Sequence, residues 1–333
     1  MKRRAFARGP VLSAIAAALA GCDSRWSALV PAGDQAAAIR GVWDLMIAIC
    51  GTMYVLVLVG LAYALLRRRS RAREGTARDP AIVAALVGWV VLTLGLLSWL
   101  TAASFLADRR LRDGRGEVSI RVTAKQWWWD VEYLDPIIAR NFRTANELHL
   151  PRDRTAHVEL RSGDVIHSFW VPSLSGKHDM IPGRVNALLL TPRVNGYFRG
   201  QCAEFCGLQH AHMALDVQVE DDAAYRAWAD RQRLPAVAPT DAAAQRGLVV
   251  YERAACAICH RIGGTPSGGR VGPDLTHLAT RRSLAAGTLA MNRGNLAAWI
   301  VDPQHAKPGN NMPAVPLTPQ DVSDLVAYLS ELK

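Results

Sequence analysis

Residues 201–213, with the sequence Q-C-A-E-F-C-G-L-Q-H-A-H-M, contain four side chains that are common metal ligands. They follow one another at intervals of four, four and three residues: Cys202, Cys206, His210 and Met213. Sulfur with imidazole selects copper, zinc or iron–sulfur clusters, and thiolates alone do not distinguish them. Met213 favours copper, because copper electron-transfer sites often carry a weak axial methionine, whereas structural zinc sites are closed by cysteines and histidines. The alternatives are a zinc site and, in an oxidising compartment, a disulfide between the two cysteines.

The segment resembles the dinuclear CuA centre of cytochrome c oxidase subunit II, in which a distant histidine precedes C-x-E-x-C-x-x-x-H-x-x-M. The distant histidine here is His167, within V-I-H-S-F-W at residues 165–170. The resemblance implies that the thiolates of Cys202 and Cys206 bridge two coppers and that His167 and His210 bind one copper each. It also implies that the thioether of Met213 and the backbone carbonyl of Glu204 complete the ligand set. It also implies that the Glu204 side chain reaches a magnesium ion at the boundary with subunit I.

Composition indicates a membrane protein. The 333 residues allow two or three domains, and half of them are apolar while only a fifth are charged. The net charge of +10 could indicate a nucleic-acid partner, but six arginines lie within residues 67–78, beside apolar runs. Membrane topology explains this cluster better, so we expect no nucleic-acid partner.

Two apolar stretches, residues 43–66 and 80–107, are each long enough to cross about 30 Å of hydrocarbon as a helix. The arginine-rich loop 67–79 between them is expected to be cytoplasmic, so both ends of the mature chain lie outside the cytoplasm. The family has this two-helix hairpin docked against subunit I, here within residues 22–115. Many members place a carboxylate near the cytoplasmic start of the second helix for proton uptake, and here Glu74 and Asp79 are the nearby acids.

Residues 1–21 predict a bacterial secretory signal. A basic start and an apolar run end in L-A-G before Cys22, which is typical of lipoprotein processing with lipid attached to Cys22. The alternative is a signal anchor with a chance cysteine. The predicted location is the bacterial inner membrane, with the remaining domains on its outer side.

Residues 116–222 contain short runs with period-two alternation, separated by Gly, Pro and Asn, which predict an antiparallel β-sandwich. The family fold, a cupredoxin-like barrel, agrees. Residues 126–129, Q-W-W-W, fall in the predicted sheet, where Trp127 and Trp129 should share one face and Trp128 the other. In the family the Trp after Gln is exposed above the copper centre and receives electrons, which implies Trp127, and we expect Trp128 to pack inside.

K-H-D-M-I-P-G-R at residues 177–184 resembles the family stretch K-x-D-x-I-P-G-R, which contacts subunit I. From the residues alone this is a loop with a turn at Pro-Gly. The resemblance implies a contact role for Asp179 and Arg184.

A connecting segment, residues 223–240, ends in a semi-rigid Pro/Ala linker and marks a domain boundary. Residues 256–260 then read C-A-I-C-H, the motif that attaches c-type haem through two thioethers, here from Cys256 and Cys259, with His260 as axial ligand. A redox dithiol or a chance occurrence is the alternative.

The last domain, residues 241–333, resembles class I cytochromes c. A helix over residues 241–253 and a final helix capped by Thr318 are expected to cross. The distal ligand is expected to be Met312, since Met/His ligation raises the potential, with Met291 as the competitor. The carbonyl of Pro273, in G-P-D-L, is expected to orient His260.

The resemblance covers nearly all of the mature chain and implies an oxidase subunit II with a fused cytochrome c domain. Electrons would pass from a cytochrome c or other donor through haem c to CuA and on to subunit I, which reduces oxygen to water with proton pumping. Subunit I, subunit III and membrane lipid are the expected partners. The alternatives are an electron-transfer protein like nitrous oxide reductase, a quinol oxidase subunit II and a copper-delivery module.

Overall fold

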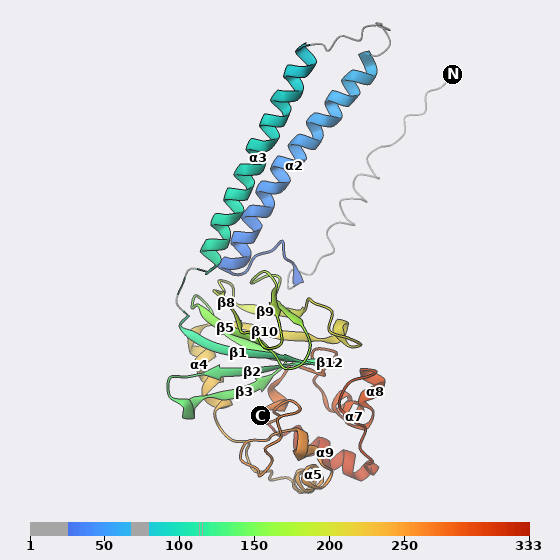
Figure 1. Cartoon of the computed structure of the whole chain (residues 1–333). Helices are drawn as coiled ribbons and strands as arrows, with labels where there is room; N and C mark the ends of the chain where they lie inside the picture. The colour runs from blue at the N-terminus through green and yellow to red at the C-terminus, as the bar shows by residue number, and fades with distance from the viewer. Residues whose placement is uncertain (1–25, 68–79, 113, 115) are drawn as a thin grey trace, which may run out of the picture. The chain divides into compact units, whose positions relative to one another are not determined.

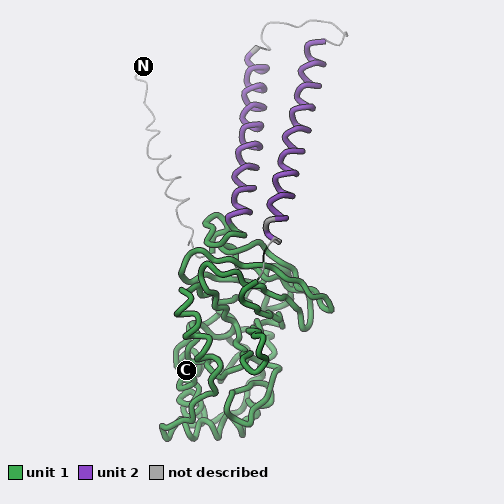
Figure 2. Tube along the Cα trace, turned by 90° about the vertical axis from the view of Figure 1, so that its left-hand side faces the viewer, with its two compact units in different colours: residues 1–36, 114–333 green, residues 37–113 purple. Residues whose placement is uncertain are grey.

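The computed structural model describes residues 26–67, 80–112, 114 and 116–333 (Figure 1). The predicted lipidation site Cys22 and the two acids of the predicted cytoplasmic loop, Glu74 and Asp79, lie outside the described residues. The chain divides into two compact units, residues 37–113 and residues 1–36 with 114–333 (Figure 2).

The smaller unit is built from two apolar helices, α2 (Asp34–Arg67) and α3 (Pro80–Arg112). Their stretches of 33 and 30 residues, Asp34–Leu66 and Pro80–Arg109, each contain 18 consecutive residues with a mean hydropathy of 2.4, so both helices are long and apolar enough to cross a membrane. Large apolar side chains such as Leu56 and Val91 are exposed along both helices. Such a continuous apolar surface fits a lipid surrounding better than water.

The larger unit contains a β-sandwich of two five-stranded sheets. The first sheet has the strand order β3 (Phe142–Ala145), β2 (Trp128–Leu134), β1 (Val118–Lys125), β5 (Ala156–Ser162), β8 (Asn186–Leu190). The second has the order β4 (Glu147–Pro151), β10 (Ala214–Glu220), β9 (Gly196–Cys202), β6 (His167–Trp170), β7 (His178–Met180). Their inner faces form one hydrophobic core.

The predicted alternation is present, but the strands are not all antiparallel. In β1 every second side chain from Val118 to Ala124 is buried in the core. However, β1 pairs with β5 and β10 with β4 in parallel, whereas the other pairs are antiparallel. Parallel neighbours arise because the chain crosses to the other sheet before it returns, and a period of two does not distinguish the two pairings.

Helix α4 (Asp222–Gln232) follows the last strand directly, within the segment predicted to connect the domains. Its Tyr225, Trp228 and Ala229 are buried in the sandwich core. The linker that follows is held against the last domain, because the amide of Ala236 donates to the carbonyl of Gly263. The linker is therefore not a free tether.

The last domain is helical: α5 (Ala242–Arg253), α6 (Cys256–Cys259), α7 (Arg293–Val301), α8 (Pro303–Ala306) and α9 (Pro319–Leu329), with a short hairpin of β11 (Ser283–Leu284) and β12 (Leu289–Ala290). The predicted crossing of the first and last helices is confirmed. At the crossing, a Cβ on Gly247 would lie only 2.0 Å from the carbonyl oxygen of Asp324, so glycine is required there. The predicted N-cap Thr318 forms a capping box with Asp321.

Candidate metal centres

The copper-ligand candidates come together because of the order of strands in the second sheet. His167 begins β6, and Cys202 ends β9. These strands are antiparallel neighbours, with Phe169 opposite Cys202, so the two side chains meet at one end of the sandwich. The loop between β9 and β10 carries the remaining candidates, and its base is closed by a hydrogen bond from the amide of Cys202 to the carbonyl of Met213.

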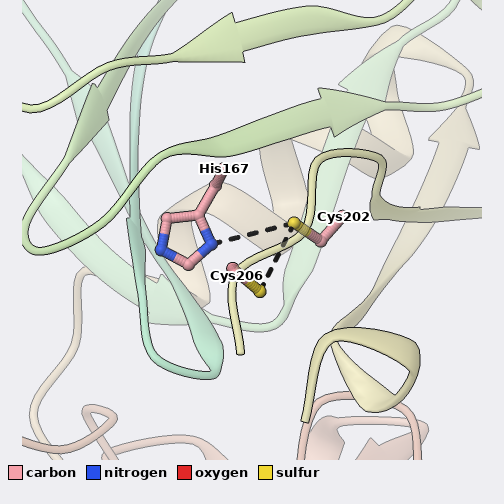
Figure 3. A group of neighbouring side chains, drawn as sticks. All are labelled: His167, Cys202 and Cys206. Carbon is pink, nitrogen blue, oxygen red and sulfur yellow. Dashed lines mark hydrogen bonds between the residues drawn. The ribbon is translucent and has the colours of Figure 1, made fainter. Parts of the chain in front are cut away.

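Five side chains and one carbonyl lie close together at this end of the sandwich (Figure 3 draws three of the side chains). The sulfur atoms of Cys202 and Cys206 are 3.8 Å apart. The Nδ1 atoms of His167 and His210 lie 3.7 Å and 3.6 Å from the sulfurs of Cys202 and Cys206, respectively. The sulfur of Met213 lies 4.0 Å from the sulfur of Cys206. The carbonyl oxygen of Glu204 lies 3.2 Å from the sulfur of Cys202.

These separations suit ligands that share a metal. Two donors bound at roughly 2.1–2.3 Å in a tetrahedral arrangement lie about 3.6 Å apart. The thiols are also coupled: the hydrogen bond with Cys206 lowers the pKa of Cys202, while the same contact raises the pKa of Cys206. Two buried thiolates this close repel one another unless a cation lies between them. Both cysteines are free in the structure, so the donor set fits a metal rather than a disulfide.

Asp164 supports this group, although no motif in the sequence points to it. One carboxylate oxygen lies 2.7 Å from Nε2 of the fully buried His167, and the other accepts a 2.6 Å hydrogen bond from the amide of Gln126. Burial opposes charge on His167, but the hydrogen bonds to Asp164 and Cys202 outweigh it and raise its pKa to about 9. A carboxylate on the outer nitrogen of a ligating histidine fixes the ring and its tautomer, which leaves Nδ1 for the metal.

The position of Trp127 corrects one expectation. Gln126 and Trp127 form the turn between β1 and β2, and the Trp127 side chain is buried with 8% exposure rather than exposed. Its indole nitrogen donates to the carbonyl of Cys206, and a Cβ on Gly207 would lie 3.1 Å from the ring. The ring therefore packs on the ligand loop itself.

The packing role expected for Trp128 is wrong. Trp129 is fully buried and meets Phe169 edge-on at 6.0 Å between ring centroids. Trp128 is only half-buried, with the Lys125 ammonium 4.6 Å from its ring centroid. The expected packing role of Trp128 thus belongs to Trp129, because in β2 the side chains of Trp129, Val131 and Tyr133 are buried and Trp128 lies on the other face.

The haem motif lies in the helical domain. Cys256 and Cys259 are half-buried free thiols at the two ends of α6. Nδ1 of His260 lies 2.8 Å from the carbonyl oxygen of Pro273, which leaves Nε2 for an iron. A Cβ on Gly272 would lie 2.6 Å from the His260 ring, so only glycine lets this loop lie against the imidazole. Thiols, imidazole and loop together fit a covalently attached haem.

Two methionines remain as distal candidates in this domain. Met312 is half-buried in the loop before α9, where its amide donates to Oδ1 of Asn310. Met291 packs against the domain's hydrophobic core. The position of Met312 in a loop held by Asn310 and Gln304 favours it as the ligand, whereas Met291 already has a packing role.

The predicted contact residues lie on an exposed surface near the ligand loop. Asp179 and Arg184 are both exposed. Lys177 joins this surface to the loop, since its ammonium lies 3.4 Å from the carboxylate of Asp179 and 3.2 Å from that of Glu204. The Glu204 side chain therefore points outward, while its carbonyl faces Cys202.

Comparison with known proteins agrees with this architecture. The family model of the periplasmic domain of cytochrome c oxidase subunit II matches residues 135–220, and that of cytochrome c matches residues 244–333. Cytochrome c oxidase subunit 2 of Alkalihalophilus pseudofirmus is 34% identical over 97% of this chain and 96% of its own length. The Bacillus subtilis protein of that name is 29% identical over 97% and 96% of the two chains. A crystal structure of the periplasmic domain of subunit II (CoxB) of Bradyrhizobium japonicum is 30% identical, with a TM-score of 0.34, and covers 36% of this chain and 96% of that one.

These matches, with two apolar helices, a cupredoxin-like sandwich and a helical cytochrome c domain, imply copper and haem as cofactors. They also imply a membrane protein with periplasmic domains that associates with other oxidase subunits and a cytochrome c donor. The chain belongs to the cytochrome c oxidase subunit 2 family, and it is the subunit through which electrons enter a haem–copper terminal oxidase.

Proposed function

We propose that this chain carries electrons from a donor through covalently bound haem c to a dinuclear CuA centre and on to subunit I, where oxygen is reduced to water with proton pumping. The observation that carries the copper assignment is the convergence of two thiols, two imidazoles, a thioether and a carbonyl.

When bound, the copper pair and the haem iron would each accept and release one electron. Cys202, Cys206, His167, His210, Met213 and the carbonyl of Glu204 would together hold the copper pair. Both cysteines are buried, so water has little access to the site. Asp164 holds the imidazole of His167 in place, and a rigid site needs little reorganisation when its charge changes.

In the haem domain, Cys256 and Cys259 would attach the haem covalently, and His260 and Met312 would bind its iron. Pro273 and Tyr251 position the proximal histidine: Pro273 accepts from its ring, and the Tyr251 hydroxyl donates to its carbonyl at 2.8 Å. Trp127, which contacts the Cys206 carbonyl, would receive the electron from the haem side.

We further propose that the exposed surface with Asp179 and Arg184 contacts subunit I, and that the outward carboxylate of Glu204 reaches a magnesium ion there. The assigned segments are a signal peptide (1–21), a hairpin (22–115), a copper domain (116–222), a connection (223–240) and a haem domain (241–333). We also propose that Cys22 is lipidated, that the protein lies in the bacterial inner membrane, and that it contacts subunit III and membrane lipid. Mass spectrometry of the mature amino terminus tests Cys22: an unmodified start elsewhere contradicts it.

The proposed cofactors are tested on the purified oxidase. Haem c should remain attached to this chain under denaturing conditions, because thioether bonds survive unfolding. The native protein should show c-haem bands together with a near-infrared mixed-valence copper band. Haem lost on denaturation, or a copper-free spectrum after metal loading, would contradict the assignment.

A further inference from the structure

The haem domain, residues 241–333, packs against the copper domain next to the proposed copper ligands. Three of the hydrogen bonds between the domains lie around this contact. Nε2 of Gln209 donates to the carbonyl of Pro308 at 2.7 Å, and Nδ2 of Asn311 donates to the carbonyl of Gln126 at 2.9 Å. The backbone amide of Ala214 donates to the carbonyl of Ala286 at 3.0 Å. The residues on the copper side belong to the ligand loop, its continuation into β10 and the turn that carries Trp127. The contact thus brings the haem domain to the place where its electron is needed.

Lys307 takes part in this contact and is buried, with 3% exposure. Its ammonium donates three hydrogen bonds to backbone carbonyls, to Trp127 at 3.1 Å, His212 at 2.9 Å and Ala285 at 3.2 Å. An ammonium has three donors, so all are used, and two of them cross from the haem domain to the copper domain. Burial lowers the pKa of Lys307 to about 8.

The turn that supplies the third carbonyl has an unusual backbone. Ala285 and Ala286 have φ values of 52° and 55°, in the left-handed region that residues with a Cβ seldom adopt. Both carbonyls serve the domain contact, since Ala285 accepts from Lys307 and Ala286 accepts from the amide of Ala214. A strained turn persists only where surrounding contacts hold it, and here Lys307 provides one of them.

We propose that Lys307 is a positioning residue that docks the haem domain on the copper domain beside Trp127. Burying a charged group is unfavourable unless the group is hydrogen-bonded. The carbonyls of Trp127, His212 and Ala285 can stabilise the Lys307 ammonium together only when the domains are docked. Undocking exposes the ammonium and separates it from Trp127 and His212. Only the consequence for electron transfer rests on the proposed function; the docking itself does not.

The test uses full-length oxidase with Lys307→Met, and Lys333→Met as the control that removes the same charge from the exposed last residue. Hydrogen–deuterium exchange at Ala214 reports docking, because its amide is bonded to Ala286 across the contact. Loss of charge-assisted hydrogen bonds should accelerate this exchange at least about tenfold in Lys307→Met. Lys307→Gln keeps two donors without the charge and should give an intermediate acceleration. Electron transfer from haem to copper should slow in the same order.

The haem and near-infrared copper bands are recorded on every variant, so a failure to form either centre is separated from a failure to dock. If Lys307→Met does not load its cofactors, the Lys307→Gln variant decides. The proposal is overturned if the Lys307 variants show the same hydrogen–deuterium exchange at Ala214 and the same rate of electron transfer as Lys333→Met. If the wild-type oxidase lacks the copper band but exchange at Ala214 is still faster in the Lys307 variants, the docking role is supported and the copper assignment is contradicted.

Discussion

The indole nitrogen of Trp127 donates a 3.0 Å hydrogen bond to the carbonyl oxygen of Cys206. The side-chain amide of Gln126 donates to the same oxygen at 2.8 Å, and the backbone amide of Gln126 donates to Asp164, which in turn contacts His167. Two proposed copper ligands are therefore held by the turn that carries the proposed electron acceptor. The ring is connected to the ligand loop through a single hydrogen bond.

Replacing Trp127 should slow the transfer of electrons from haem to copper. Trp127→Phe keeps an aromatic ring but loses the hydrogen bond that connects the ring to Cys206, so transfer should slow moderately. Trp127→Ala removes the ring and should slow transfer further. Flash or stopped-flow reduction, with both centres fully loaded, measures the rates, and Trp128→Ala is the matched control. Wild-type kinetics in Trp127→Ala would mean that the electron takes another path.

Asp164→Asn should weaken copper binding. The variant keeps the size of the side chain but loses the charge that holds Nε2 of His167. Changes of this kind at a ligating histidine typically cost about 10–100-fold in metal affinity. Chelator competition followed by the near-infrared band measures the affinity, with Asp230→Asn on the exposed side of α4 as the control. Equal affinities in the two variants would remove Asp164 from the site.

Trp129→Ala should destabilise the copper domain by about 3–5 kcal/mol, because it leaves a large cavity in the core. Trp128→Ala should cost about 1 kcal/mol or less, since its ring is half-exposed. Thermal unfolding of the copper domain, followed by loss of the near-infrared band, compares the two. A larger loss for Trp128→Ala would contradict the packing described for β2.

Spacing alone predicted much of the copper site because four candidate ligands lie within residues 202–213. His167 is remote in sequence, and only the resemblance to a family joined it to them. The alternation placed Trp127 and Trp129 on one face, but which face is buried depends on the second sheet and on the haem domain. Parallel pairing of β1 with β5 was missed because alternation is the same in both orientations.

Helix α4, Asp164 and Lys307 are harder to predict from the sequence. Tyr225, Trp228 and Ala229 are spaced as one face of a helix, a pattern that could have predicted α4. Asp164, three residues before His167, resembles any acid in a turn until the fold brings Gln126 beside it. Lys307 is a single lysine in a polar loop, and its burial depends on contacts between two domains.

His149 should give the copper domain a pH-dependent stability. Its ring stacks on Trp228 and lies 3.7 Å and 3.6 Å from the carboxylates of Glu147 and Glu220. Burial disfavours its charge, but the two carboxylates outweigh this and raise its pKa. Because the folded pKa is raised, the stabilisation is fully present below the unfolded value of about 6.5 and is lost as pH rises through the folded pKa.

The melting temperature of the copper domain should therefore fall above about pH 6.5 more steeply in the wild type than in His149→Gln. His157→Gln, at an exposed position of β5, is the control and should follow the wild type. Parallel curves for the wild type and His149→Gln would show that this histidine contributes no pH dependence.

The near-infrared spectrum of the purified oxidase with Cys202→Ser or Cys206→Ser tests the central claim most directly. The sulfurs of these residues are 3.8 Å apart, and both are proposed as bridges between two coppers. Each variant should lose the mixed-valence copper band while the c-haem bands of the intact haem domain remain unchanged. A mixed-valence band that persists in either variant would contradict the assignment of a thiolate-bridged copper pair to this site.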